Sequence, residues 1–189
     1  ARLFMRNKIV ILTYSLGGAG AERVVANLLS HLDRKKYDIH LVLMNTDIEY
    51  DISQDQHIHF IEKSYRYEGE FWKFIKLPLL AWRFARYCRK NKIELVLAVM
   101  SRPNLIASMS RVFGQKAAVL ISERCYTPET YKTNSIVGRI KVALLKFCYP
   151  KADAILPNSR GTIQALQQHY GIVSKYHLVK NPTDIQKSS

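Results

Sequence analysis

KIVILTYSLGGAGAER, residues 8–23, contains the features that decide the fold. Its first half is a hydrophobic run typical of a buried strand, and its second half is a turn with Gly17, Gly18 and Gly20. Apolar residues then recur at helical spacing over residues 24–32. The glycines therefore lie at a strand-to-helix corner, where exposed amides and the helix dipole favour a phosphate or a sugar hydroxyl. A turn that only needs a flexible backbone would show the same glycines.

The glycine corner differs from two well-known phosphate-binding loops. No Gly-Lys-Ser or Gly-Lys-Thr follows the first glycines, which excludes a P-loop. Arg23 replaces the third glycine of a dinucleotide-binding fingerprint. Glu22, at the helix start, is expected to brace the corner by capping the first helical amides rather than to act as a base. We therefore predict a ligand-binding corner, and the sequence identifies no catalytic residue.

The composition fits one α/β domain. The chain has 189 residues, of which 48% are hydrophobic, enough for a sizeable core. Cys88, Cys125 and Cys148 form no C-x-x-C pair, so a reducing, cytoplasmic compartment is expected. No apolar run is long enough to span a bilayer. His57 and His59 lie two apart without a third ligand nearby, so we predict no metal site and no cofactor.

The net charge of +14 suggests an anionic partner. Residues 70–92 combine basic and aromatic side chains at helical spacing, and Pro78 is expected to kink this segment or to mark the first turn of its second half. The side chains predicted to contact an anionic membrane are Trp72, Lys76, Trp82, Arg83, Arg86 and Lys90. A crossover helix with a broad buried face and a solvated basic edge explains the pattern equally well. No nucleic-acid partner is expected, because the charge is spread along the chain and no RNP, zinc-finger or basic-region pattern is present.

Strand-like and helix-like segments alternate along the chain. Further strands are predicted at residues 37–44, 57–61, 94–99, 117–121, 154–156 and 176–179, and further helices at 103–113, 136–147 and 159–170. This alternation predicts an α/β fold with a doubly wound parallel sheet, which binds ligands beyond the carboxyl ends of its strands. The predicted site residues are Gly17, Gly18, Gly20, Glu22, Ser101, Arg102, Asn104, Glu123, Arg124, Asn158 and Ser159.

Four short motifs resemble, in their order along the chain, those of one enzyme family. They are Gly20-Ala21-Glu22-Arg23-Val24-Val25-x-Asn27-Leu28, Ser122-Glu123-Arg124, Pro157-Asn158-Ser159 and Val179-Lys180-Asn181-Pro182-x-Asp184. Together they resemble the N-terminal, Rossmann-like domain of retaining glycosyltransferases of family 4, which have the GT-B fold. The resemblance covers nearly the whole chain, from Met5 to Asp184.

The resemblance implies a retaining hexosyltransferase that uses a nucleotide sugar, usually a UDP-sugar, and a lipid-linked or polysaccharide acceptor. In such enzymes the N-terminal domain mainly holds the acceptor, and the glycine corner approaches the donor diphosphate. Residues 1–184 would form this domain and residues 185–189 the end of a hinge, before a donor-binding domain that lies outside this chain. The chain alone is expected to be inactive. The enzyme is expected to act in the cytoplasm, at the inner face of the cell membrane, in cell-envelope glycan synthesis. A stand-alone nucleotide-binding or regulatory module is the alternative.

Two positions depart from the pattern of the family. Ala19 replaces the first glycine of the pair that commonly precedes Ala-Glu, and Arg124 stands where many members carry a histidine that contacts the donor sugar. Arginine is permanently charged and binds phosphate well, so Arg102 and Arg124 are expected to hold a diphosphate-bearing lipid acceptor. A salt bridge from Arg124 to Glu123 or Glu129 is the structural alternative.

Overall fold

The computed structural model describes residues 6–18, 20–50, 57–62, 69–124 and 135–180. Its six-stranded sheet has the order β3-β2-β1-β4-β5-β6, and all neighbouring strands are parallel. The strands are β1 (Asn7–Thr13), β2 (Tyr37–Leu43), β3 (His57–Phe60), β4 (Leu95–Val99), β5 (Ala118–Glu123) and β6 (Ala154–Pro157). The chain builds outward from β1 to one edge and then from β4 to the other. The predicted doubly wound, Rossmann-like fold is therefore confirmed.

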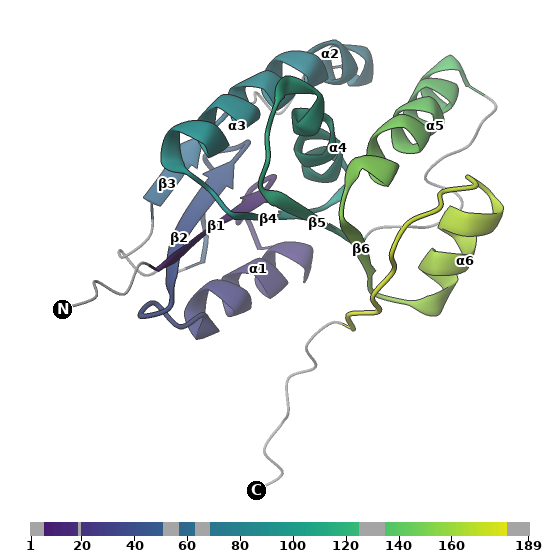
Figure 1. Cartoon of the computed structure of the whole chain (residues 1–189). Coiled ribbons are helices and arrows are strands. Elements are labelled where there is room, and N and C mark those ends of the chain that lie inside the picture. Colours follow the sequence, from purple (N-terminus) through teal and green to yellow (C-terminus); the bar gives the residue numbers. More distant parts are fainter. Residues whose placement is uncertain (1–5, 19, 51–56, 63–68, 125–134, 181–189) are drawn as a thin grey trace, which may run out of the picture.

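Helices cover both faces of this sheet (Figure 1). On one face lies α1 (Gly20–His31), and on the other lie α3 (Leu77–Asn91), α4 (Ser101–Ser110) and α5 (Ile136–Cys148). Helix α2 (Glu70–Ile75) leads into α3, and α6 (Arg160–Gln168) follows β6. Two short 3-10 helices, η1 (Arg111–Phe113) and η3 (Tyr149–Lys151), extend α4 and α5.

Alternate residues of β1 enter two separate cores. Val10 and Leu12 pack with residues of α3, α4 and α5, whereas Ile9 and Ile11 pack with residues of α1. A parallel strand covered by helices on both faces needs apolar side chains at every position. This explains why the strand reads in the sequence as a continuous hydrophobic run rather than as an alternating one.

Two prolines lie inside the first turn of a helix. Pro78 is the second residue of α3, so the predicted basic helix is divided into α2 and α3 at Lys76. Pro103 is the third residue of α4, and the helix therefore begins at Ser101 rather than at Pro103 as predicted. Both positions tolerate proline because amides in the first turn have no intrahelical acceptor.

The predicted strand at residues 176–179 is not formed. Tyr176 makes one isolated parallel bridge with Ile155, and the Val179 amide donates to the Pro157 carbonyl at 2.9 Å. A second bridge would need a reciprocal N–H at position 157. Proline has none, so the pairing ends after one bridge.

Candidate functional site

The switch point of the sheet lies between β1 and β4, where the strand order reverses direction. In doubly wound sheets, ligands bind beyond the carboxyl ends of the strands at this point. The loop after β1 carries the glycine corner, and Met100 and Ser101 follow β4 directly. Two of the predicted site segments therefore lie on either side of the switch point.

The glycine corner leaves the start of α1 open. Gly18 has a φ of +96°, a backbone conformation in which any side chain would be strained, so this position favours glycine. Gly20 begins α1, and a Cβ atom placed on it would meet nothing within 4 Å. A ligand can thus approach the backbone at the first residue of the helix. Ala19 lies outside the described residues.

Glu22 braces the corner through a residue that sequence analysis did not single out. Its side chain is buried in the first turn of α1 and accepts a hydrogen bond from the hydroxyl of Ser15, in the loop after β1. This bond ties the loop to the helix across the glycines. A bracing role is therefore supported, although its partner is a serine hydroxyl.

Met100 is held in a strained backbone conformation at the switch point. Its φ is +82°, which a non-glycine residue adopts only when its surroundings impose it. The Met100 amide donates to the Ser122 carbonyl at 3.2 Å. No local sequence signal marks this position.

A buried carboxylate closes the carboxyl end of β5. Glu123 accepts a hydrogen bond from Ser101 Oγ at 3.2 Å and another from the Tyr149 hydroxyl. Burial of Glu123 is nearly complete, with 1% of its surface exposed. Glu123 therefore joins β5 to the start of α4 and to η3, and Tyr149 is a partner that sequence analysis missed.

Asn104 lies in the protein interior rather than in the cleft. Its side chain is fully buried, and Nδ2 donates to the Ser122 carbonyl at 3.0 Å. The residue is thus a cross-link between α4 and β5. Its predicted contact with a ligand is corrected accordingly, because the spacing along α4 turns residue 104 toward the sheet.

Arg102 shares a buried acidic partner with Lys76. Arg102 Nη1 lies 3.1 Å from Glu62 Oε2, and Lys76 Nζ lies 3.6 Å from Glu62 Oε1. Arg102 also donates from Nη2 to the Lys73 carbonyl at 3.5 Å. Glu62 follows β3 closely, so its position after a strand is the signal that could have identified it.

A cavity of about 350 Å³ opens beside Arg102, at the carboxyl end of the sheet. Its cationic lining comes from Arg102, Lys73 and Lys141. Its apolar lining includes Tyr14, Phe74, Leu77, Leu105 and Leu145. Charge and apolar surface therefore meet in one pocket, which suits a ligand that has both an anionic group and a hydrocarbon group.

Arg124 lies in a different cavity from Arg102. This second cavity, of about 700 Å³, is lined by residues of α1, by Leu97 and Val99 of β4, by Leu156 and by Arg124. Arg124 Nε donates to Ser122 Oγ at 3.0 Å, and burial lowers the pKa of Arg124 from its usual value. The two arginines therefore do not converge on one acceptor phosphate, which corrects the prediction that pairs them.

Asn158 and Ser159 hold the loop after β6. Asn158 Nδ2 donates to the Arg124 carbonyl at 3.3 Å, and Ser159 Oγ accepts from the Thr162 amide at 3.1 Å. Ser159 is thus the predicted N-cap of α6, a role that occupies its hydroxyl.

The outer face of α2 and α3 carries an exposed apolar stripe. Leu80, Phe84 and Cys88 are buried against the sheet, as a crossover helix requires. On the other side, four large apolar residues are exposed, and Arg83, Arg86 and Lys90 lie beside them. The exposed residues are Trp72 (60%), Ile75 (50%), Leu79 (48%) and Trp82 (41%). Lys76, predicted to contact a membrane, instead pairs with Glu62.

None of the helices in the described ranges has the length and hydrophobicity needed to cross a membrane.

Comparisons with known proteins agree with this architecture. The profile of Glycosyltransferase Family 4 matches residues 18–187. The chain is 42% identical over 181 residues to the N-acetylgalactosamine-N,N'-diacetylbacillosaminyl-diphospho-undecaprenol 4-alpha-N-acetylgalactosaminyltransferase of Campylobacter jejuni, an alignment that covers 95% of this chain and 49% of that protein. The chain thus spans about half the length of this relative.

Solved structures share the fold at low sequence identity. Sucrose-phosphate synthase from Thermosynechococcus elongatus superposes with a TM-score of 0.71 at 14% identity, over 93% of this chain and 48% of that one. UGT2 of Phytolacca americana superposes with a TM-score of 0.59 at 11% identity, over 93% and 54% of the two chains. With the family match and the sheet topology, these findings identify the chain as a member of Glycosyltransferase Family 4 that carries the N-terminal domain of the GT-B fold.

Proposed function

We propose that this chain is the acceptor-binding half of an enzyme that transfers a sugar from a nucleotide sugar, expected to be a UDP-sugar, to a lipid diphosphate-linked acceptor. The cavity beside Arg102 carries the proposal, because it joins three cations to an apolar wall at the carboxyl end of the sheet. Cations suit the phosphate oxygens, and apolar surface suits the first part of the lipid. The C. jejuni relative, whose name specifies a diphospho-undecaprenol acceptor, supports this acceptor class.

In the proposed reaction, the bond between C1 of the sugar and the nucleoside diphosphate breaks, and C1 forms a bond with an acceptor hydroxyl oxygen. The hydroxyl proton is released, and the diphosphate leaves with increased negative charge. Amides at the open start of α1 would stabilise that charge. Retention of configuration is part of the proposal, since an α-linked nucleotide sugar that gives the α linkage named for the relative retains its configuration.

The test uses the protein at its natural length, because the chain covers half of its relative. It is incubated with a panel of UDP-sugars and an undecaprenyl diphosphate-linked glycan. Mass spectrometry detects the extended lipid, and NMR gives the anomeric configuration. We expect transfer with retention from at least one donor, and no transfer by residues 1–184 alone. Hydrolysis without transfer, or inversion, would contradict the proposal.

Lys73 and Lys141 provide a direct test of the cavity. Replacing both with glutamine in the natural-length protein is expected to raise KM for the lipid diphosphate acceptor by about tenfold or more, because each charge-assisted contact is lost. Lys146→Gln is the matched control, since Lys146 lies on α5 outside the cavity lining. An unchanged KM in the double variant would place the acceptor elsewhere.

We also propose that α2 and α3 rest on an anionic membrane, at the inner face of the cell membrane, and bring the cavity to the lipid acceptor. Two exposed tryptophans suit the interfacial region of a bilayer. The Arg86 guanidinium lies 5.8 Å from the centre of the Trp82 ring, so charge and aromatic surface form one patch. Phe74, which also lines the cavity, lies on α2.

The membrane proposal predicts a charge-dependent affinity. Replacing Arg83, Arg86 and Lys90 with glutamine should weaken binding to anionic vesicles by about 100-fold, from about 1 kcal/mol for each basic side chain. The control replaces Lys35, Lys116 and Lys175, which are exposed on other segments. Co-sedimentation with vesicles of rising phosphatidylserine content measures both variants. Equal weakening in the two would mean that net charge alone drives binding.

A further inference from the structure

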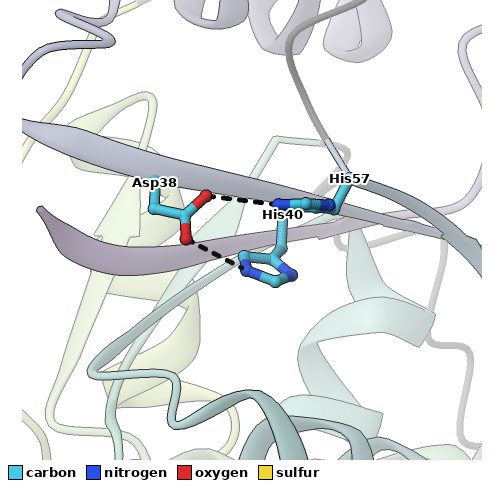
Figure 2. A group of neighbouring side chains, drawn as sticks. All are labelled: Asp38, His40 and His57. Carbon is cyan, nitrogen blue, oxygen red and sulfur yellow. Dashed lines mark ion pairs between the residues drawn. The ribbon is translucent and has the colours of Figure 1, made fainter.

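Two histidines and one aspartate converge at the amino ends of β2 and β3 (Figure 2). Asp38 and His40 are two residues apart on β2, and their side chains therefore share one face of the strand. His57 of β3 is the register partner of His40. The prediction that no third ligand lies near His57 is therefore wrong, because strand pairing brings together residues that are distant in sequence.

The distances between these side chains suit a metal ion. His57 Nε2 lies 3.5 Å from Asp38 Oδ1, and His40 Nε2 lies 3.9 Å from Asp38 Oδ2. One ligand atom from each of the three residues can be chosen so that all lie within 4.8 Å of one another. Tetrahedral zinc with bonds near 2.05 Å places its ligand atoms about 3.3 Å apart. Small side-chain rotations would therefore complete the geometry.

His40 supplies an independent observation. Its side chain is buried, and Nε2 has no hydrogen-bond partner in the described part of the chain. The other ring nitrogen, Nδ1, lies 2.8 Å from the Tyr87 hydroxyl. When Nδ1 donates its hydrogen to Tyr87, Nε2 presents a lone pair on the side of Asp38, and the His57 ring lies beside the His40 ring with centroids 4.7 Å apart. This arrangement is the outer-shell contact that fixes most metal-binding histidines.

The surroundings of the cluster allow an ion to enter. The His57 side chain is 66% exposed, so a metal can reach the cluster and keep a water molecule as its fourth ligand. One competing cation is present, because Lys8 Nζ lies 3.9 Å from Asp38 Oδ2. The Lys8 side chain is 40% exposed and can turn into solvent.

We propose that Asp38, His40 and His57 bind a zinc ion that fastens the edge strand β3 to β2. Two imidazoles and one carboxylate form a ligand set that zinc accepts. The site lies at the amino ends of the strands, at the opposite end of the sheet from the cavity beside Arg102. Its role is therefore structural and separate from the proposed sugar transfer.

Zinc titration of the metal-free chain tests this proposal. All proteins carry Cys125→Ser, because a thiol also binds zinc. Zinc at a hundredfold excess over its Kd is expected to raise Tm by about 5–10 °C. Substitution by Co²⁺ should give the intense visible absorption of a tetrahedral site.

Three variants decide whether the ion sits at this cluster. His57→Asn is expected to weaken zinc binding by at least tenfold, and since His57 is exposed the fold should persist. Lys8→Gln should tighten binding, because it removes the competing cation. His177→Asn is the matched control, an exposed histidine outside the cluster, and should titrate like the parent protein. Equal affinity in the His57 variant and the parent, or no gain in the Lys8 variant, would overturn the proposal.

Discussion

Replacing Phe84 with alanine is expected to lower the free energy of unfolding by about 3–5 kcal/mol. The Phe84 side chain is fully buried in the core formed by α3, α4, α5 and the sheet. Removing its ring leaves a cavity that close-packed neighbours cannot fill, so both burial and packing are lost. The effect would be a large part of the total stability of a domain of this size.

Urea denaturation followed by circular dichroism measures this loss. Trp82→Ala is the matched control, since Trp82 is an aromatic residue of the same helix with 41% of its surface exposed. The control should change stability by less than about 1 kcal/mol. A comparable loss in both variants would mean that the outer face of α3 is packed against the protein, and would also remove the basis for membrane contact.

Replacing Arg102 with methionine is expected to cost about 3 kcal/mol of stability. The Arg102 and Glu62 side chains are 15% and 7% exposed, so the variant leaves a carboxylate in a largely dry environment. Lys76 remains near Glu62 but is itself 36% exposed, and water screens its charge. The penalty therefore comes mainly from a buried carboxylate that has lost the better buried of its two cationic partners.

The double variant Arg102→Met, Glu62→Gln separates this penalty from any role in ligand binding. Removing both charges should restore at least half of the lost stability, which a double-mutant cycle in urea would reveal as coupling. In the natural-length protein, the same double variant should keep a raised KM for the lipid diphosphate acceptor. If the two single substitutions changed the free energy of unfolding in a strictly additive way, the interaction between Arg102 and Glu62 would contribute nothing to stability.

The fold could be predicted from the sequence because its main signals are local. Buried parallel strands require continuous apolar runs, and the helices between them require apolar residues at helical spacing. The glycine corner was predictable because a strand, a glycine turn and a helix occur in immediate succession, whereas the position of the switch point beside it follows from the strand order. The N-cap at Ser159 was also predictable, because the serine directly precedes a helical pattern.

The site was harder to predict because its contacts join distant segments. Glu62, which follows β3, meets Arg102 of α4, and Tyr149 of η3 reaches Glu123 of β5. Arg102 and Arg124 line two different cavities. The cavity that each arginine lines depends on the face of the sheet toward which its segment of the chain runs, and no local sequence pattern predicts that face. The failed strand at residues 176–179 depends on the missing amide of Pro157, a residue of its partner strand.

The position of β1 in the middle of the sheet has a consequence during synthesis. Its partner β2 begins at Tyr37, but its other partner, β4, begins only at Leu95. Ribosomes add about 5–20 residues per second, so one side of β1 lacks its neighbour for roughly 4–16 s after Thr13 is made. Over that time the unpaired amides and carbonyls of a very apolar strand can pair with another chain. A strand that is paired on both sides in the finished protein is thus open on one side in the nascent chain, and the yield of the protein in cells should depend on chaperones that bind before β4 emerges.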